Sequence, residues 1–256
     1  MRQITLGNGE ITVSQVALGI MRMGKKSVED ATTVLKTVYD QGVNFFDSAD
    51  IYTDGKSELV FGKALKNSGI PRDKVYIQSK AGIVLDDART TADGLVFGQR
   101  YDFSKEHLLQ AVGQKLIINQ VQLSLKHTPL IDSGIFVNRL EDEAVDRESG
   151  MLEYSRKNNI TLQAWSPYQY GMFEGVFIDN PKFPELNAMM DEIAKKYGVT
   201  KNAIATAWIT RLPHNVQVIL GSMNPQHLEE SIAGADIRLT RQEWYDLYLA
   251  AGHKLP

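Results

Sequence analysis

The chain has 256 residues, no cysteine and a formal net charge of −3 from 28 basic and 31 acidic residues. A hydrophobic fraction of 43% excludes a disordered chain, and the lack of a Lys/Arg-rich block argues against nucleic acid as a partner. Because no apolar run approaches the roughly 20 residues of a membrane span and only five scattered histidines are present, we expect a soluble cytoplasmic protein without a metal site.

The first half of the chain alternates short apolar runs with helical patterns. Asn8-Gly9 between alternating apolar residues predicts a hairpin. Ser27, followed by Asp30 three residues later, predicts the start of a helix, and Ser57 opens the next one. A loop is expected from Ala81 to Phe103, and a helix begins at Ser104.

The second half continues the alternation. A long polar loop is expected before a helix that begins at Met151. Two amphipathic helices cover residues 186–197 and 200–212, another opens at Pro225, and Thr240 with Glu243 forms a capping box before the last helix. Between these helices, short apolar runs predict six strands, which end near Ile20, Phe46, Gln78, Ile118, Ala164 and Leu220.

Strands that alternate with helices favour parallel pairing in an α/β fold, either an open sheet or a barrel. With no linker, low-complexity tract or obvious repeat, we expect a single domain over residues 1–256. In a βα barrel, functional groups follow the carboxyl ends of the strands. That rule directs attention to Asp47-Ser48-Ala49-Asp50-Ile51-Tyr52 and to Ser79-Lys80.

These two segments suggest acid–base chemistry. A phenol titrates near pH 10, so Tyr52 needs help to act as a general acid, and an ammonium beside it lowers its pKa. Lys80 would supply that charge, and Asp47 would pair with Lys80. Taken singly, each residue has an ordinary interpretation as a turn former, a packing residue or a surface charge. Lys80 at a strand end could alternatively form a Schiff base, as in aldolases.

Gly221-Ser222 before a helix is a candidate phosphate site, where backbone N–H groups and the helix dipole would face an anion. The other interpretation is an ordinary strand-to-helix turn. The chain lacks the Gly-x-Gly-x-x-Gly dinucleotide pattern after its first strand.

The chain resembles the aldo-keto reductases, in particular the bacterial NADP-dependent oxidoreductase type, over nearly its whole length. The most specific match is Asp47-Ser48-Ala49-Asp50-Ile51-Tyr52, which is similar to the family's Asp-x-Ala-x-x-Tyr motif, and Ser79-Lys80 matches the catalytic lysine. Other similar segments are Ala17-Leu18-Gly19, Asn119-Gln120-Val121, Ala164-Trp165-Ser166-Pro167 and Ile219-Leu220-Gly221-Ser222.

The resemblance implies a TIM-type (β/α) barrel with an N-terminal β-hairpin. It also implies NADP(H)-dependent reduction of an aldehyde or ketone, in which Tyr52 gives the proton while Lys80 and Asp47 tune it. The partner would be a small-molecule carbonyl substrate, and the protein a monomer or weak homo-oligomer. The implied cofactor-binding residues are Gly19, Gln120, Trp165, Ser166, Gly221, Ser222 and His227, with His227 where many relatives place an arginine on the 2′-phosphate.

The chain departs from the family pattern in one region. At Val112–Gly113 it passes directly from a segment similar to the third helix to one similar to the approach to the sixth strand. Two βα units, roughly 60 residues at about 31 per unit, are therefore expected to be missing, and with them the family's catalytic histidine. His107 and His127 do not take its place. The barrel is expected to be incomplete, with about six of eight strands.

This departure leaves a second functional hypothesis, a catalytically impaired cofactor-binding or regulatory relative of the same fold. Substrate choice would depend on the loops Ala81–Phe103 and Pro167–Phe183. Lys201 and Arg211 are further basic candidates for contact with a cofactor phosphate.

Overall fold

The computed structural model describes residues 1–7, 9–80, 83–90, 96–101, 117–171 and 174–256. Contacts within the chain define two compact units. Unit 1 comprises Met1–Gln15, Ile117–Ile219 and Glu230–Pro256, and unit 2 comprises Val16–Leu116 and Leu220–Glu229. The expectation of a single domain stays a prediction.

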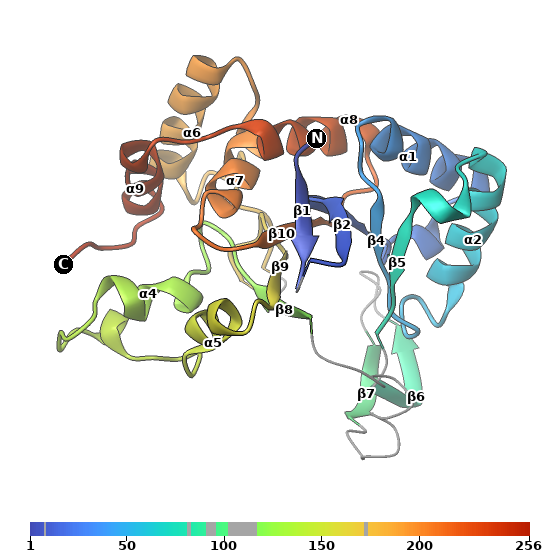
Figure 1. Ribbon diagram of the computed structural model, residues 1–256, viewed down its shortest axis with the longest axis horizontal. Helices are drawn as coiled ribbons and strands as arrows, with labels where there is room; N and C mark the ends of the chain where they lie inside the picture. Colours follow the sequence, from blue (N-terminus) through green and yellow to red (C-terminus); the bar gives the residue numbers. More distant parts are fainter. Residues whose placement is uncertain (8, 81–82, 91–95, 102–116, 172–173) are drawn as a thin grey trace. The chain divides into compact units, whose positions relative to one another are not determined.

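Unit 2 is built on three parallel strands in the order β5-β4-β3. They are β3 (Val16–Gly19), β4 (Phe45–Asp47) and β5 (Tyr76–Gln78). Helices α1 (Val28–Asp40) and α2 (Lys56–Ser68) follow the first two strands and lie together beside the sheet (Figure 1). As predicted, Ser27 caps the start of α1, and its hydroxyl accepts a hydrogen bond from the Asp30 N–H at 3.0 Å.

The loop expected from Ala81 to Phe103 is wrong in part, because this stretch contains a hairpin. Strands β6 (Ile83–Thr90) and β7 (Val96–Tyr101) pair antiparallel and form a sheet of their own. They therefore add no parallel strand to unit 2. The helix expected from Ser104 and the Val112–Gly113 junction fall within residues 102–116 and so outside the described residues.

Unit 1 begins with the predicted hairpin, in which β1 (Gln3–Leu6) pairs antiparallel with β2 (Ile11–Ser14). Its main sheet has three parallel strands in the order β10-β9-β8. They are β8 (Ile118–Gln122), β9 (Thr161–Trp165) and β10 (Val216–Leu220). All six strands expected from short apolar runs are thus present, although β8 begins at Ile118, near which the predicted strand was expected to end, and continues to Gln122.

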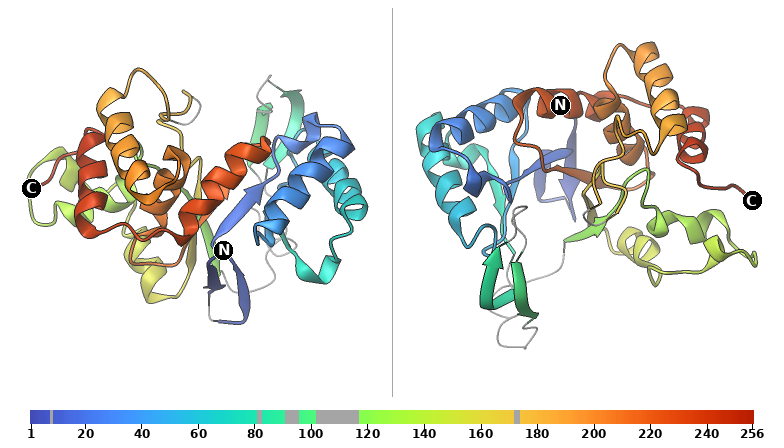
Figure 2. Two further views of the ribbon diagram at one scale, coloured as in Figure 1. Left: turned by 90° about the horizontal axis from the view of Figure 1, so that it is seen from above. Right: turned by 180° about the vertical axis from the view of Figure 1, so that it is seen from behind.

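The helices of unit 1 follow the predicted order with one addition. The expected helices are α5 (Met151–Lys157), α6 (Pro184–Tyr197), α7 (Lys201–Thr210), α8 (Pro225–Ala233), which begins in unit 2, and α9 (Arg241–Ala250). The addition is α4 (Pro129–Ile135), which replaces part of the expected loop and begins at a proline, a residue preorganised for the first helical turn. Figure 2 shows α6, α7 and α9 packed together. Short 3₁₀ segments are η1 (Met23–Lys25), η2 (Arg72–Lys74), η3 (Asp142–Ala144) and η4 (Gly234–Asp236).

Two tryptophans join α7 to α9. The rings of Trp208 and Trp244 stack with centroids 4.9 Å apart, and each indole N–H donates to the other residue's carbonyl oxygen at 3.1 Å. Both side chains are buried, so their polar N–H groups need these partners. The start of α9 is therefore fixed both by this pair and by its own cap.

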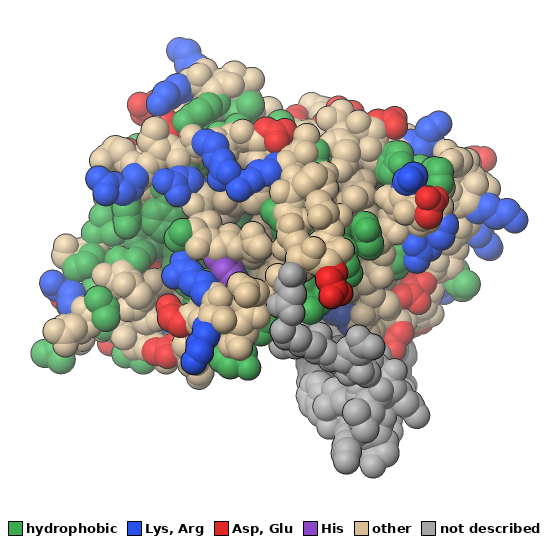
Figure 3. All heavy atoms as spheres, viewed as in Figure 1, with side chains coloured by type: hydrophobic (Ala, Val, Ile, Leu, Met, Phe, Trp, Pro, Cys, Tyr) green, Lys and Arg blue, Asp and Glu red, His purple; other side chains and the backbone are tan. Residues whose placement is uncertain are grey.

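The described residues include no helix long and apolar enough to cross a membrane. Within the same residues, no cluster of three or more His, Asp or Glu side chains could hold a metal ion. On the face that Figure 3 shows, Lys and Arg side chains are interspersed with Asp and Glu and with hydrophobic side chains.

The cap of α9 gives a stability prediction. Thr240 and Glu243 form the expected capping box, in which the Thr240 hydroxyl accepts from the Glu243 N–H at 3.2 Å and the Glu243 carboxylate accepts from the Thr240 N–H at 2.7 Å. We expect Thr240→Ala to lower the free energy of unfolding by about 1 kcal/mol, measured by urea denaturation.

Thr200 is the matched control, because it also precedes a helix but its side chain makes no capping bond. Thr200→Ala should leave the free energy of unfolding nearly unchanged. Equal losses in the two variants would contradict a role for the capping box.

Candidate active site

Asp47 and Lys80 meet where β4 and β5 end in unit 2. The Lys80 ammonium lies 2.7 Å from Asp47 Oδ1 and donates a second hydrogen bond to the Ser48 carbonyl oxygen at 2.6 Å. Asp47 is only 3% exposed, whereas the Lys80 side chain is 34% exposed. A buried carboxylate is costly unless it is paired, so this ion pair is what allows a charge at the end of β4.

Gln78 completes the set of partners around Asp47. It is the direct neighbour of Asp47 across the parallel ladder, and its amide donates to Asp47 Oδ1 at 2.8 Å. The sequence analysis did not single out Gln78. Its position in the last residue of β5, two residues before Lys80, is the signal that could have identified it.

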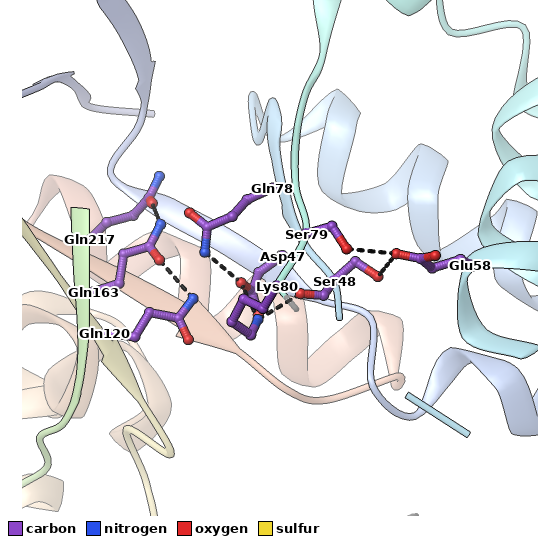
Figure 4. A network of polar contacts seen from close by, with 9 residues as sticks. All are labelled: Asp47, Ser48, Glu58, Gln78, Ser79, Lys80, Gln120, Gln163 and Gln217. Carbon is purple, nitrogen blue, oxygen red and sulfur yellow. Dashed lines mark hydrogen bonds and ion pairs between the residues drawn. The ribbon is translucent and has the colours of Figure 1, made fainter. Parts of the chain in front are cut away.

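Glu58 in α2 connects the two segments that carry the ion pair. The hydroxyl groups of Ser48 and Ser79 both donate to Glu58 Oε1, each at 2.9 Å (Figure 4). Ser48 follows Asp47 and Ser79 precedes Lys80, so one carboxylate holds both strand ends. Sequence reasoning missed this residue because the helical pattern of α2 gives no sign of which strand ends it faces.

Tyr52 stands on a strained turn after β4. The next three residues, Thr53, Asp54 and Gly55, have φ values of 53°, 53° and 76°, in the left-handed region that a β-branched residue such as Thr53 rarely adopts. The Thr53 hydroxyl donates to the Met21 carbonyl oxygen at 3.1 Å, which holds the turn against the segment after β3.

Gly24 lies against the same turn. A Cβ atom at this position would lie 2.9 Å from the Ser57 nitrogen and 2.9 Å from the Thr53 Cβ, so a larger residue would displace the turn. The Gly24 N–H donates to the Ser57 hydroxyl at 3.1 Å, and that hydroxyl donates to the Met21 carbonyl oxygen at 2.9 Å. The position of Tyr52 therefore depends on the close packing of two loops.

Tyr52 is near both members of the ion pair. The Lys80 ammonium lies 5.0 Å from the centroid of its ring. Burial raises the pKa of Tyr52 above its ordinary value near 10, and the charge of Asp47 and a hydrogen bond from the phenol to that carboxylate raise it further. The prediction that Lys80 lowers the pKa of Tyr52 is therefore wrong. The lysine charge is already compensated by Asp47, and burial favours the neutral phenol.

Of the other residues of unit 2 singled out by the sequence, Gly19, Gly221 and Ser222 lie at or just after strand ends, and His227 lies on a helix. Gly19 ends β3 and is buried, in register with Asp47. Gly221 and Ser222 follow β10, and the Gly221 carbonyl oxygen accepts from the Arg22 guanidinium at 3.2 Å. His227 is exposed on α8. The N–H groups of Asn224 and Gln226 donate to the Ser222 hydroxyl and the Asn224 amide oxygen at 3.1 and 3.0 Å, as in an ordinary turn before a helix.

The remaining cofactor candidates belong to unit 1. Gln120 lies on β8 and donates to Gln163 of β9 at 2.7 Å. Trp165 ends β9 and is half-buried, and Ser166 after it has a left-handed φ of 50°.

Two histidines and two basic residues considered in the sequence have other positions. His107 lies outside the described residues, and His127 closes a tight turn with Ser124 through two backbone hydrogen bonds of 3.1 Å. Lys201 pairs with Asp179 and, at 3.1 Å, with Asp191. The Arg211 side chain donates to the Leu239 carbonyl oxygen at 2.8 Å.

Comparison with known proteins places the chain in a family. Residues 15–129 and 116–248 match the aldo/keto reductase family, so the chain belongs to it. It is 24% identical to a 6-dehydroglucose reductase of Agrobacterium fabrum, over 98% of each chain, and 23% identical to an NADH-specific methylglyoxal reductase of Escherichia coli, over 94% of this chain and 95% of the relative. A Bombyx mori aldo-keto reductase solved in complex with NADP is similar in structure, with a TM-score of 0.63 and 16% identity, over 99% of this chain and 94% of that one.

The expected fold class is confirmed. The fold is that of the aldo-keto reductase (β/α) barrel, and the described residues supply six of its parallel strands. The family and its named relatives support an oxidoreductase that acts in carbonyl reduction generally, and family members bind a nicotinamide cofactor. They do not favour the alternative of an impaired relative.

Two features of the comparisons bear on the two βα units that the sequence analysis expects to be missing. The alignment with the Agrobacterium relative spans 301 positions, so at least 45 of them, the difference from 256, hold no residue of this chain. The family match also falls into two segments that overlap at residues 116–129. The loss of two βα units and its location at Val112–Gly113 stay predictions.

The electrostatics of Tyr52 can be tested by titration. Because its pKa is raised, Tyr52 should remain protonated at alkaline pH values where ordinary tyrosines ionise, and the tyrosinate absorbance of Tyr52→Phe should match that of the wild type through this range. Asp47→Asn removes the negative charge that raises the pKa, so Tyr52 should then ionise at lower pH. Asp54→Asn, on the exposed part of the same turn, is the control and should leave the titration unchanged. Ionisation of Tyr52 in the ordinary range in the wild type would contradict this account.

Proposed function

We propose that this chain is an NADP(H)-dependent oxidoreductase that reduces an aldehyde or ketone to an alcohol, with Tyr52 as the proton donor. The observation that carries the proposal is the cluster of Asp47, Lys80 and Tyr52 in unit 2, where an ion pair with a buried carboxylate lies beside a phenol. The substrate would be a small carbonyl compound, in line with the names of the relatives.

Tyr52 is suited to hold a proton until it is needed. Its raised pKa keeps the phenol protonated at neutral pH. Reduction adds one hydride and one proton across the carbonyl bond, and NADPH, when bound, would supply the hydride to the carbon. Tyr52 would give its proton to the oxygen as negative charge develops there, because an alkoxide is a stronger base than a phenolate.

Lys80 and Asp47 would act on Tyr52 through position and charge. When Tyr52 loses its proton, the attraction of the Lys80 ammonium would offset part of the repulsion between the phenolate and Asp47. Asp47 holds that ammonium in place. These contacts suit an ammonium group, whereas a Schiff base needs a neutral amine, so they argue against aldolase chemistry at Lys80.

The residues proposed to bind the cofactor have suitable chemistry. In unit 1, the Gln120 amide can recognise a carboxamide, the half-buried Trp165 ring can stack on a flat ring, and Ser166 can donate to a phosphate. In unit 2, Gly19, Gly221 and Ser222 would border a phosphate, and the Arg22 guanidinium lies beside Gly221. His227 is the proposed contact for a 2′-phosphate, and the preference for NADP(H) over NAD(H) rests on the resemblance.

Turnover tests the role of Tyr52. We expect Tyr52→Phe to lower kcat for NADPH-dependent reduction of a small aldehyde or diketone by at least about 100-fold, because general acid catalysis contributes on that order. The dissociation constant of NADPH, measured by quenching of tryptophan fluorescence, should change little.

Tyr76→Phe is the matched control, since Tyr76 lies on β5 in the same unit but is exposed. It should retain the wild-type kcat. Equal rates for Tyr52→Phe and the wild type would remove Tyr52 as proton donor, and failure of the wild type to bind NADPH would overturn the proposed function as a whole.

A further inference from the structure

A pocket of about 370 Å³ lies at the amino end of β10 in unit 1. It is lined by the N-terminal segment that includes β1, by the segment that joins α7 to β10, and by Arg238 ahead of α9. Gly221 and Ser222 follow the carboxyl end of the same strand. The pocket is therefore at the other end of β10 from the turn proposed to bind a cofactor phosphate.

Three arginines line this pocket: Arg2, Arg211 and Arg238. The first two are half-buried and Arg238 is exposed. Arg211 uses its Nε–H to donate to the Leu239 carbonyl oxygen at 2.8 Å. Within the part of the chain that the structure describes, none of the three guanidinium groups forms an ion pair with a carboxylate. The pocket thus gathers positive charge and leaves it largely uncompensated.

Arg2 and Arg238 are close enough to repel each other. Partial burial and the positive charge of Arg238 lower the pKa of Arg2, whereas the charge of Asp236 raises it. The Asp236 carboxylate is itself shared, because it pairs with the amino group of Met1 at 3.3 Å. One carboxylate therefore offsets only part of the charge around the pocket, and an anion bound there would relieve the repulsion.

Gln15 adds an independent observation to the same pocket. It is one of the lining residues and is only 2% exposed. Its amide nitrogen donates to the Val216 carbonyl oxygen at 3.4 Å, but its Oε1 atom has no hydrogen-bond partner among the described residues. A buried acceptor without a donor is unfavourable, so a donor supplied from outside the chain would satisfy it.

We infer that this pocket binds a small phosphate-bearing molecule that also carries an O–H donor. The guanidinium groups of Arg2, Arg211 and Arg238 would hold the phosphate oxygens, since their planar N–H groups match a phosphate in geometry and charge. Gln15 Oε1 would accept the hydrogen bond of the O–H group. Inorganic phosphate has both features, because it keeps a proton at neutral pH, whereas sulfate has the same shape and no proton.

The two anions test the pocket directly. We expect isothermal titration calorimetry at neutral pH to show that phosphate binds about 3- to 10-fold more tightly than sulfate, the range of one net hydrogen bond. Phosphate should also raise the melting temperature. Glycerol 3-phosphate distinguishes the sources: tighter binding than phosphate assigns the pocket to a phosphorylated polyol, and weaker binding assigns it to the free ion.

Arginine variants locate the binding. Arg2→Gln and Arg238→Gln should each weaken phosphate binding about 10-fold, because each removes a charge-assisted hydrogen bond. Arg147→Gln is the matched control and should bind phosphate as the wild type does. Arg147 lies outside the pocket and donates to the carbonyl oxygens of Asp142 and Val145 at 2.8 and 3.3 Å.

Gln15→Met tests the unpartnered acceptor. It removes Oε1 at similar volume, so the preference for phosphate over sulfate should fall to near one while sulfate still binds. Should this variant not fold, as judged by thermal melting, the preference of the wild type and the two arginine variants give the decision.

Several results would overturn the inference: no phosphate binding by the wild type, equal binding of phosphate and sulfate, or wild-type affinity in both Arg2→Gln and Arg238→Gln. The last result would mean that phosphate binds elsewhere on the chain. None of these measurements involves NADPH or a carbonyl substrate, so the outcome is independent of the proposed function.

Discussion

The buried carboxylate of Asp47 is the constraint on which the candidate site depends. A charge that is 3% exposed at the end of a strand must be compensated nearby, and the chain does so with Lys80 and Gln78 from the adjacent strand. These contacts bring the ends of β4 and β5 together. Glu58 then ties the neighbouring serines of both segments to α2, so that the position of the lysine is fixed by a helix as well as by its partner.

The same carboxylate determines the state of Tyr52. A lysine alone would favour the phenolate, but Asp47 neutralises the lysine and accepts a hydrogen bond from the phenol. The result is a tyrosine that stays protonated beside the ion pair of Asp47 and Lys80. A strained turn at Thr53 and the close approach of Gly24 hold the phenol there, which places the backbone strain next to the proposed chemistry.

In unit 1, the buried polar side chains are neutral amides, and they too are satisfied by partners on adjacent strands. Its sheet buries Gln163 and Gln217, and each amide is satisfied by the next, in a sequence that begins at the Ser14 carbonyl oxygen. A charged network can hold a group in place by attraction alone. An amide row also gives each member a direction, because each amide has a donor side and an acceptor side.

The local sequence determined much of the fold. Short apolar runs marked all six parallel strands, Asn8-Gly9 marked the first hairpin, and Ser27 and Thr240 marked helix starts whose capping bonds are present. The motif from Asp47 to Tyr52, with Lys80 at the next strand end, correctly indicated which side chains lie close together. These features depend on residues a few positions apart or on the rule that parallel strands end at one edge.

Only the tertiary structure decided the rest. The hairpin of β6 and β7 and the short helix α4 fall where the sequence has no clear periodicity, so a loop was the natural expectation. The direction of the Tyr52 pKa and the orientation of the Gln120 amide depend on the burial and spacing of groups on separate strands. The field at a side chain and the partner of a buried amide are set by distances in space, and a linear pattern of residue types contains no such distances.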